Sequence, residues 1–327
     1  MSIGTSASFD NPTAMHTFIA RRLISTLPVL IFVAIFVFLI LRLTPGDPAA
    51  LIVGDMGTEA DVSRVRQSLG LEGSLPSQFL IWVGELLRGD LGQSYYFKTS
   101  VGTLITQRLE PTLSLAALTI VLAVVIAVPL GVLAAARHGG WLDRMLMGFS
   151  VLGFSVPVFV IGYALIWLFA LKLGWLPVQG YGRLSSGVGP WLSHLVLPAL
   201  TLSLVYTALI ARVTRAAVSE ALTEDYIRTA RAKGLTERAV LMRHALVNAA
   251  VPIITVIGIG IALLIGGVVV TETVFAIPGL GQLTVDAVLS RDFPVIQGVI
   301  LLFSVVYVLI NLLIDLSYVL LDPRIRY

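Results

Sequence analysis

Glu272 is the residue whose type and position most directly suggest chemistry, because it stands at the end of a long uncharged run. An ionisable side chain is expensive to place in apolar surroundings, so one found there is a candidate functional group. Thr273 follows it directly, and the turn-forming residues Pro278 and Gly279 come soon after. Two interpretations are open: these four residues line a pathway or gate, or Glu272 is an interfacial residue that caps local backbone.

Asp315 is a second carboxylate within an apolar run, close to the end of that run. A carboxylate near the end of such a segment is less costly than one at its centre. Arg212 and Arg215 are cations that could neutralise it. We therefore expect a structural ion pair or an interfacial position for Asp315, rather than a role in binding substrate or moving protons.

Three prolines, Pro157, Pro198 and Pro252, interrupt apolar runs. A proline frees a backbone carbonyl of the preceding turn, and freed groups in a membrane helix can line a pathway. Prolines are also common in membrane helices generally, so kinks without ligand contact are the simpler interpretation. The candidate pathway residues at the first of these breaks are Phe154, Ser155, Pro157 and Phe159.

Other kinds of chemistry lack the residues they need. The chain has no cysteine, which excludes thiolate metal sites and cysteine nucleophiles. Its four histidines are scattered, without metal-ligand spacing, and no serine–histidine–acid set stands out. We expect no catalytic residue and no metal site. The chain also has no Gly-x-x-x-x-Gly-Lys-Ser/Thr phosphate loop, so any ATP must be bound by another polypeptide.

The elements that position these residues are long apolar helices. Of the 327 residues, 57% are hydrophobic and 13% charged, whereas a soluble domain has about 25% charged residues. A membrane-spanning helix needs about 20 apolar residues, and only helices or closed barrels satisfy their backbone in lipid. The sequence predicts an all-α membrane protein in contact with the lipid bilayer, and a net charge of +3 gives no reason to expect a nucleic-acid partner. The six predicted transmembrane helices lie at 23–41, 111–136, 145–171, 191–211, 245–271 and 293–314.

Lysine and arginine in the short loops predict the orientation, since these residues concentrate on the cytoplasmic side. The loops after the second and fourth spans are basic, as are the segments that flank the first and last spans. Both termini are therefore predicted to be cytoplasmic. The long acidic connection has helical signals at 59–69 and 78–87, which favour a small external lid. The predicted division is 1–22 as a cytoplasmic tail, 23–43 as the first span, 44–110 as the external loop or lid, 111–321 as the core of five spans, and 322–327 as a cytoplasmic tail.

The basic cytoplasmic loop 212–244 is predicted to contain a helix over 219–233 that ends at Gly234. Glu224 stands four residues before Arg228, which is the favourable order for a helical ion pair. Gly234 can adopt the left-handed conformation that closes a helix. The apolar side chains that recur at helical spacing are those of Leu222, Tyr226, Ile227 and Ala230.

A second helix is expected directly after this glycine. Thr236 can cap it, Glu237 in its first turn complements the helix dipole, and it continues through Arg243 and His244 into the fifth span. Two capped helices around a glycine, joined to a span, predict a lever that docks a partner, rather than a solvated basic loop. The residues of this docking loop are Tyr226, Ile227, Arg228, Thr229, Ala230, Arg231, Lys233, Gly234 and Leu235.

The docking loop resembles the EAA loop of the membrane-spanning permeases of ATP-binding-cassette (ABC) importers, which reads Glu-Ala-Ala, three residues, then Gly. Arg228, Thr229, Ala230 and Gly234 occupy those places, so the second alanine and the glycine match and Arg228 replaces the acidic residue. Further motifs, in the same order, resemble the dipeptide/oligopeptide branch of this family and in particular its first, B-type permease subunit. The resemblance covers about residues 17–327 and is carried by residues 21–23 with 43–48, 89–94, 225–235, 271–281 and 322–324.

This resemblance implies a six-helix permease of the type I importers, located in the bacterial inner membrane and not itself an enzyme. It implies a second homologous permease subunit, two cytoplasmic ATP-binding-cassette ATPases and an external solute-binding protein as partners. ATP and Mg would be bound by the ATPases, and no cofactor by this chain. The implied substrate is a dipeptide or oligopeptide, with nickel complexes, glutathione or oligosaccharides as alternatives in related importers. A secondary carrier or channel that works alone is the alternative from another class.

Overall fold

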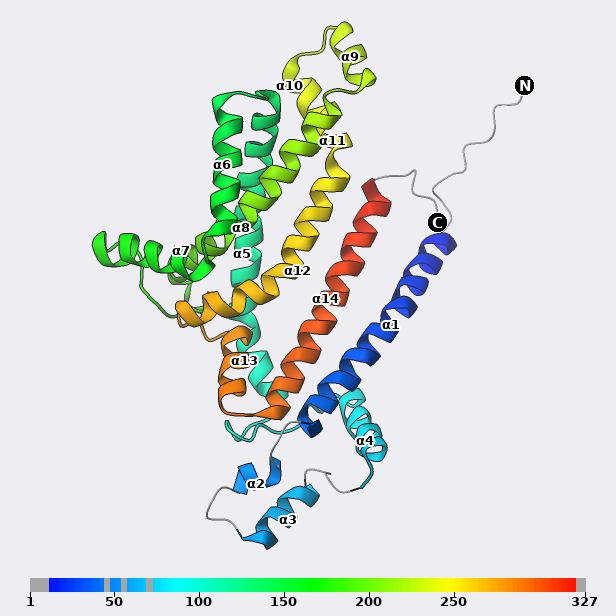
Figure 1. Cartoon of the computed structure of the whole chain (residues 1–327), viewed down its shortest axis with the longest axis vertical. Coiled ribbons are helices and arrows are strands. Elements are labelled where there is room, and N and C mark those ends of the chain that lie inside the picture. Colours follow the sequence, from blue (N-terminus) through cyan, green and yellow to red (C-terminus); the bar gives the residue numbers. More distant parts are fainter. Residues whose placement is uncertain (1–11, 44–47, 54–57, 69–72, 322–327) are drawn as a thin grey trace, which may run out of the picture.

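The computed structural model describes residues 12–43, 48–53, 58–68 and 73–321. Within these ranges the chain consists of helices and connecting segments, and its one extended pairing is an isolated bridge between Gln93 and Ser100. Figure 1 shows the long helices running side by side, with short helices gathered at the two ends of the bundle. The predicted all-α membrane fold is confirmed.

Most of the predicted spans are long helices in the structure. The first lies in α1 (Pro12–Leu43), whose described apolar part is Ile24–Ile40. The second, fourth, fifth and sixth lie in four helices that are long and apolar enough to cross a membrane, namely α5 (Val101–Ala136), α8 (Val188–Ala221), α12 (Ala250–Val274) and α14 (Phe293–Leu321).

Helix α5 begins at Val101, ahead of the predicted start at residue 111. Ser100 caps this earlier start, because its hydroxyl accepts a hydrogen bond from the Thr103 backbone N–H at 3.2 Å. Pro111 therefore lies inside the helix instead of at its beginning. The helix therefore starts before the predicted span does, and the bounds 44–110 of the external segment stay a prediction.

The third predicted span is sharply bent. Helix α6 (Trp141–Ser155) and helix α7 (Val158–Leu165), which continues into the π-helical segment η1 (Ile166–Lys172), meet at 105° and make a fifth candidate span if they are counted as one. Pro157 carries no backbone N–H, and it also disfavours a helical conformation for the preceding residue, which is extended here. The expected kink at Pro157 is thus a break that turns α7 away from the bundle (Figure 1).

The short elements divide between the two ends of the bundle (Figure 1). One end, called the α9 end below, also holds the start of α1 and the end of α14, and its short elements are α9 (Asp225–Ala232), α10 (Glu237–Ala239), the π-helical segment η3 (Val240–Ala245) and α11 (Leu246–Asn248). The opposite end, the α13 end, holds α2 (Pro48–Val53), α3 (Glu59–Ser68), α4 (Leu75–Leu87) and α13 (Leu280–Leu289); a short 3₁₀ turn, η2 (Leu184–Ser186), precedes α8.

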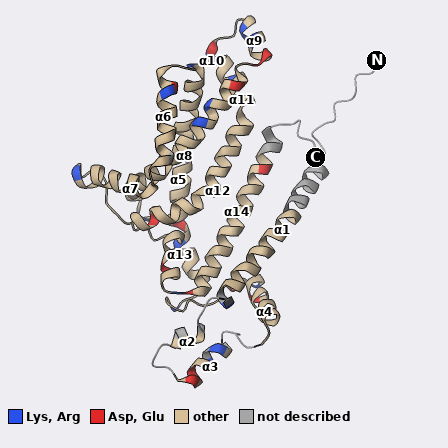
Figure 2. Ribbon diagram, viewed as in Figure 1, with Lys and Arg blue, Asp and Glu red and all other residues tan. Residues whose placement is uncertain are grey.

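Charged side chains follow this division. Figure 2 shows the described Lys, Arg, Asp and Glu residues mostly near the two ends, while the middle parts of α5, α12 and α14 carry none. Lipid contact explains the pattern, since a charge in the centre of a span costs several kcal/mol, about 2.5–3.5 on insertion scales.

The core of the bundle is built on a close contact between α5 and α8. A Cβ atom on Gly131 of α5 would lie 2.7 Å from the backbone oxygen of Ala211 and 2.7 Å from Cβ of Thr214, both on α8. Small buried residues on α5, among them Ala127 and Ala134, extend this contact. Small residues allow helix backbones to approach closely, which is how membrane helices gain packing energy.

The segment between α4 and α5 is fastened to the turn between α13 and α14. Asp292 in this turn is fully buried. Its carboxylate accepts hydrogen bonds from the Ser94 hydroxyl at 2.5 Å and from the backbone N–H groups of Tyr95 and Tyr96 at 3.2 and 3.1 Å. The pKa of the Tyr95 phenol is raised to about 12, mainly because the phenol is buried. This contact fixes the segment between α4 and α5 against the bundle.

Candidate coupling site

Residues 219–233 form parts of two helices instead of the single helix predicted. Helix α8 continues to Ala221, and α9 begins at Asp225 after the extended residue Glu224. The Thr223 hydroxyl donates to the Glu220 carbonyl at 2.7 Å and closes the intervening turn. Such a local bond offers the backbone an alternative to continuing the helix.

The bend after α9 has the geometry that the sequence predicts. Gly234 has a φ of 77°, a left-handed conformation that side-chain-bearing residues rarely adopt. Its N–H donates to the Arg231 carbonyl at 2.9 Å and ends α9. Thr236 then caps α10, because its hydroxyl accepts from the Ala239 N–H at 3.4 Å. The predicted glycine stop and threonine cap are both confirmed.

The inner face of α9 joins the core of the bundle. Ile227 is fully buried and Ala230 is 5% exposed. Tyr226, which the spacing placed on this face, is instead exposed. The inner face packs in a cluster with side chains of α5, α8 and the chain from η3 into α12, which are Val132, Val218, Val240, Ala245, Ala249 and Ile253.

The outer face of α9 is open and mostly basic. Arg228 pairs with Asp225 at 3.3 Å and not with Glu224 as predicted, because α9 starts at Asp225 and leaves Glu224 outside the helix. Burial, and to a smaller extent the nearby Glu224 carboxylate, raises the pKa of the Tyr226 phenol above its ordinary value. The exposed predicted residues of the docking loop are Tyr226, Arg228, Thr229, Arg231, Lys233, Gly234 and Leu235.

One ion pair holds the two arms of the bend together. Arg231 of α9 donates to both carboxylate oxygens of Glu237 of α10, at 2.8 and 3.2 Å. This hydrogen bond lowers the pKa of Glu237 below its ordinary value. A carboxylate with a lowered pKa contributes stability above its unfolded pKa and loses it as the pH falls through the lowered value. The pair is therefore intact at neutral pH.

Replacing Glu237 with glutamine is expected to loosen this bend slightly. The pair is exposed and screened by solvent, so we expect amide hydrogens of residues 225–239 to exchange about twofold faster at neutral pH. Hydrogen-exchange mass spectrometry of the purified transporter measures this. Glu224→Gln removes the same charge from the same loop without breaking the pair, so an equal acceleration in both variants would contradict the assignment.

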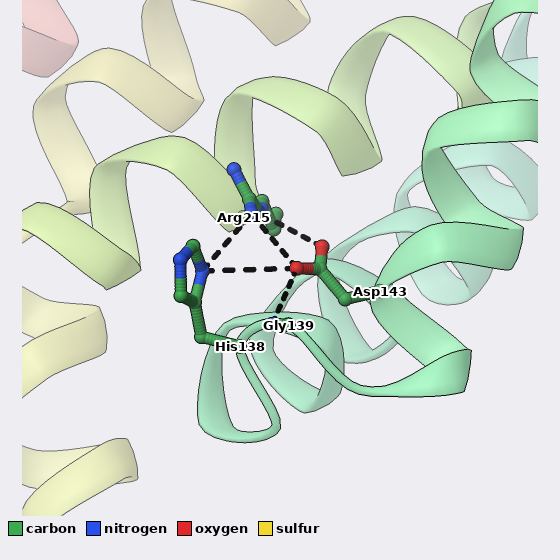
Figure 3. A network of polar contacts seen from close by, with 4 residues as sticks. All are labelled: His138, Gly139, Asp143 and Arg215. Carbon is green, nitrogen blue, oxygen red and sulfur yellow. Dashed lines mark hydrogen bonds and ion pairs between the residues drawn. The ribbon is translucent and has the colours of Figure 1, made fainter.

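A buried ion pair ties α8 to α6 near the α9 end (Figure 3). The Arg215 guanidinium donates to both oxygens of Asp143 at 2.8 Å and to Nδ1 of His138 at 2.9 Å. The Gly139 N–H donates to the same carboxylate at 2.9 Å, and the Asp143 side chain is only 6% exposed. Arg215 is one of the two cations that could have neutralised Asp315. In the structure it is paired with Asp143.

At the opposite end, Glu272 is fully buried beneath the first turn of α13. The Thr112 hydroxyl donates to Oε1 at 2.6 Å and the Gln282 N–H to Oε2 at 3.0 Å, while the Leu280 N–H donates to the Thr112 hydroxyl at 2.8 Å. A Cβ atom on the buried Gly279 would collide with this carboxylate. Among the two sequence interpretations, these contacts match a cap of local backbone, and a pathway role stays a prediction.

The other predicted pathway residues fall into separate groups. Ser155, Pro157 and Phe159 are exposed at the α6–α7 bend, and Phe154 lies in α6 with its side chain outside the described part. Thr273 is exposed, and its hydroxyl donates to the Val269 carbonyl at 2.9 Å. Pro198 lies inside α8 and Pro252 in the first turn of α12. Pro278 lines a cavity of about 150 Å³ with Gln107, Arg108, Glu110, Pro111, Tyr181 and Arg183.

Known proteins are similar to this chain over most of its length. Residues 127–327 match the family of binding-protein-dependent transport system inner membrane components, and residues 15–116 match the N-terminal part of such membrane components. The probable peptide ABC transporter permease y4tP of Sinorhizobium fredii is 56% identical over 313 residues, which cover 96% of this chain and 100% of the relative. The glutathione transport system permease GsiC of Pectobacterium atrosepticum is 43% identical with the same coverage.

The fold has a solved counterpart. A chain of the MetNI methionine ABC transporter, in an inward-facing conformation, matches with a TM-score of 0.57 and 21% identity over 67% of this chain and 96% of that chain. The spans and the basic bend therefore define a membrane-embedded transport subunit. The chain belongs to the family of binding-protein-dependent transport system inner membrane components, and it is a permease subunit of an ABC importer in the inner membrane.

Proposed function

We propose that this permease subunit forms one half of the translocation pathway of an importer for peptides. Its α9–Gly234–α10 bend docks a cytoplasmic ATPase subunit, which binds ATP and Mg, and the second half of the pathway comes from a homologous permease. The name of the 56% identical relative supports a peptide substrate, and the relative named for glutathione, itself a tripeptide, is compatible with it.

The main observation in support of this proposal is that α9 has one exposed face and one face packed in the core. Its outer face is exposed, and its inner residues Ile227 and Ala230 pack in one cluster with α5, α8 and α12. A packed core is stiff and transmits displacement. A partner that moves α9 therefore moves three spans together, which a solvated loop could not do.

The orientation follows from the same proposal. With the α9 end in the cytoplasm, the start of α1 and the end of α14 also face the cytoplasm, because they lie at this end (Figure 1). The α13 end, with α2, α3 and α4, then faces the external solute-binding protein. This arrangement supports cytoplasmic termini and an external segment that follows the first span.

Replacing Gly234 with proline tests the proposal. Proline cannot adopt the φ of 77° and removes the N–H that bonds the Arg231 carbonyl, so the bend is lost. In proteoliposomes that contain the complete transporter, we expect peptide uptake per ATP hydrolysed to fall severalfold. Gly174→Pro is the control, because Gly174 also has a positive φ of 64° and open space around it but lies between η1 and η2.

Two results would contradict the proposed coupling. An unchanged ratio of uptake to hydrolysis in Gly234→Pro would exclude a role for the bend, and an equal loss in Gly174→Pro would make the effect a general one. Uptake by this chain alone in liposomes, without ATPase subunits, would support the alternative of a secondary carrier or channel.

A further inference from the structure

Helix α4 is fastened to the outside of α1 at the α13 end. The Arg42 Nε donates to Oε1 of Gln78 at 3.1 Å. The Phe38 ring contacts the rings of Phe79 and Trp82, with centroids 5.2 and 5.7 Å apart. Figure 1 shows α4 beside the end of α1, on the side of the bundle opposite α6 and α7.

These contacts set the depth of α4 in the bundle. Phe38 lies one turn inside Arg42, and the neighbouring Val37 accepts a hydrogen bond from Gln297 of α14 at 3.1 Å. Gln297 belongs to the first two turns of α14, so α4 lies where α1 and α14 leave the apolar part of the bundle. Tryptophan and cationic residues such as Trp82 and Arg42 are typical of this level in membrane proteins.

The surface of α4 that faces away from α1 is divided into two strips. Leu80, Val83 and Leu87 share one strip by their spacing of three and four residues. Leu80 is 71% and Leu87 83% exposed, although both are large apolar side chains. The adjoining strip carries Ser77, Glu85 and Arg88, with Ile81 as its one apolar side chain.

We propose that α4 lies in the surface of the outer leaflet, with the Leu80–Leu87 strip against lipid and the polar strip towards water. With 13 residues the helix is too short to span a bilayer. The last turns of α1 also carry exposed apolar side chains, among them Ile35, Phe36 and Ile40, as expected beside lipid. An apolar strip beside a polar one is the pattern of an interfacial helix.

This placement changes how the external segment works. Asp292 fastens the chain that follows α4, and the bilayer holds α4 itself. The part of the segment from α4 to α5 is then held in place beside α1 and the turn before α14, and is not a lid that opens. The lipid contact of α4 does not depend on ATP coupling, whereas its assignment to the outer leaflet rests on the orientation in the proposed function.

Single cysteines test the placement, because the chain contains none of its own. Leu80→Cys and Leu87→Cys report on the apolar strip, and Ser77→Cys and Glu85→Cys are controls on the polar strip. Each variant, in the complete transporter with no cysteine in its other subunits, is placed in phospholipid nanodiscs. A charged maleimide measures water access, and an attached nitroxide measures collisions with oxygen and with a water-soluble nickel chelate. Retained uptake confirms that each variant is folded.

In lipid, positions 80 and 87 are expected to react with the maleimide about tenfold more slowly than positions 77 and 85. Their nitroxides are expected to collide more often with oxygen than with the chelate, and the controls to show the reverse. Rapid labelling at all four positions would overturn the proposal in favour of a water-exposed helix. Protection of positions 80 and 87 from both oxygen and the chelate would overturn it in favour of a protein partner.

Discussion

Replacing Glu272 with alanine is expected to lower the free energy of unfolding by about 4 kcal/mol. The substitution removes the carboxylate that accepts from the Thr112 hydroxyl and the Gln282 N–H, and the other acceptor of the hydroxyl, the Arg108 carbonyl, lies at a longer 3.4 Å. Each unsatisfied buried group costs about 1–3 kcal/mol. A denaturant titration of the purified transporter, followed through the folded fraction of this chain, measures the loss.

The matched control for this prediction is Glu272→Gln. The amide keeps the length of the side chain and one oxygen acceptor, so it can still bond either Thr112 or Gln282. We expect less than half the loss seen with alanine. Equal losses in the two variants would show that the acceptor is unimportant, and wild-type stability of the alanine variant would contradict the backbone cap altogether.

Replacing Arg215 with glutamine is expected to lower the free energy of unfolding by about 2 kcal/mol. Asp143 would then keep a charge at a site that is only 6% exposed, with the Gly139 N–H as its remaining strong donor. The expected loss is below that of a deep ion pair because the site lies near an end of the bundle. The same titration measures it, and we also expect reduced uptake, because α8 loses its fixed contact with α6.

A double substitution separates the charge from the packing. Asp143→Asn together with Arg215→Gln removes both charges and leaves two amides that can bond each other. We expect the double variant to be more stable than Arg215→Gln alone, which is the sign of direct coupling between the two positions. Additive losses would contradict the pairing.

Local signals predicted the bend at the α9 end, because they act within a few residues. Gly234 needs only its missing Cβ to adopt a positive φ, and Thr236 needs only the N–H of Ala239. The predicted start of this helix, at residue 219, was wrong for an equally local reason. Thr223 closes a turn with Glu220, a bond that competes with the helix, and this moved the ion pair of Arg228 from Glu224 to Asp225.

Contacts between distant segments could not be predicted from the sequence. Asp143 and Arg215 are 72 residues apart, and Thr112 and Glu272 are 160 apart, so nothing in their spacing links them. The signal for Glu272 was its position beside an apolar run, which marked it without naming its partners. Pro157 likewise predicted a break, whereas the 105° angle depends on how α7 packs against α12, where Gly162 lies beside Val274 and Phe275.

The π-helical segment η3 (Val240–Ala245) sets the rotation of the bend about the helix axis. A π-turn accommodates one more residue than an α-turn, and one residue corresponds to about 100° of rotation. The extra residue therefore rotates the whole bend, with its Arg231–Glu237 pair, by about 100° relative to α12. The number of residues in η3 thus sets the direction in which the exposed bend points. Two chains with identical bends, but with η3 lengths that differ by one residue, would present different faces to the same partner.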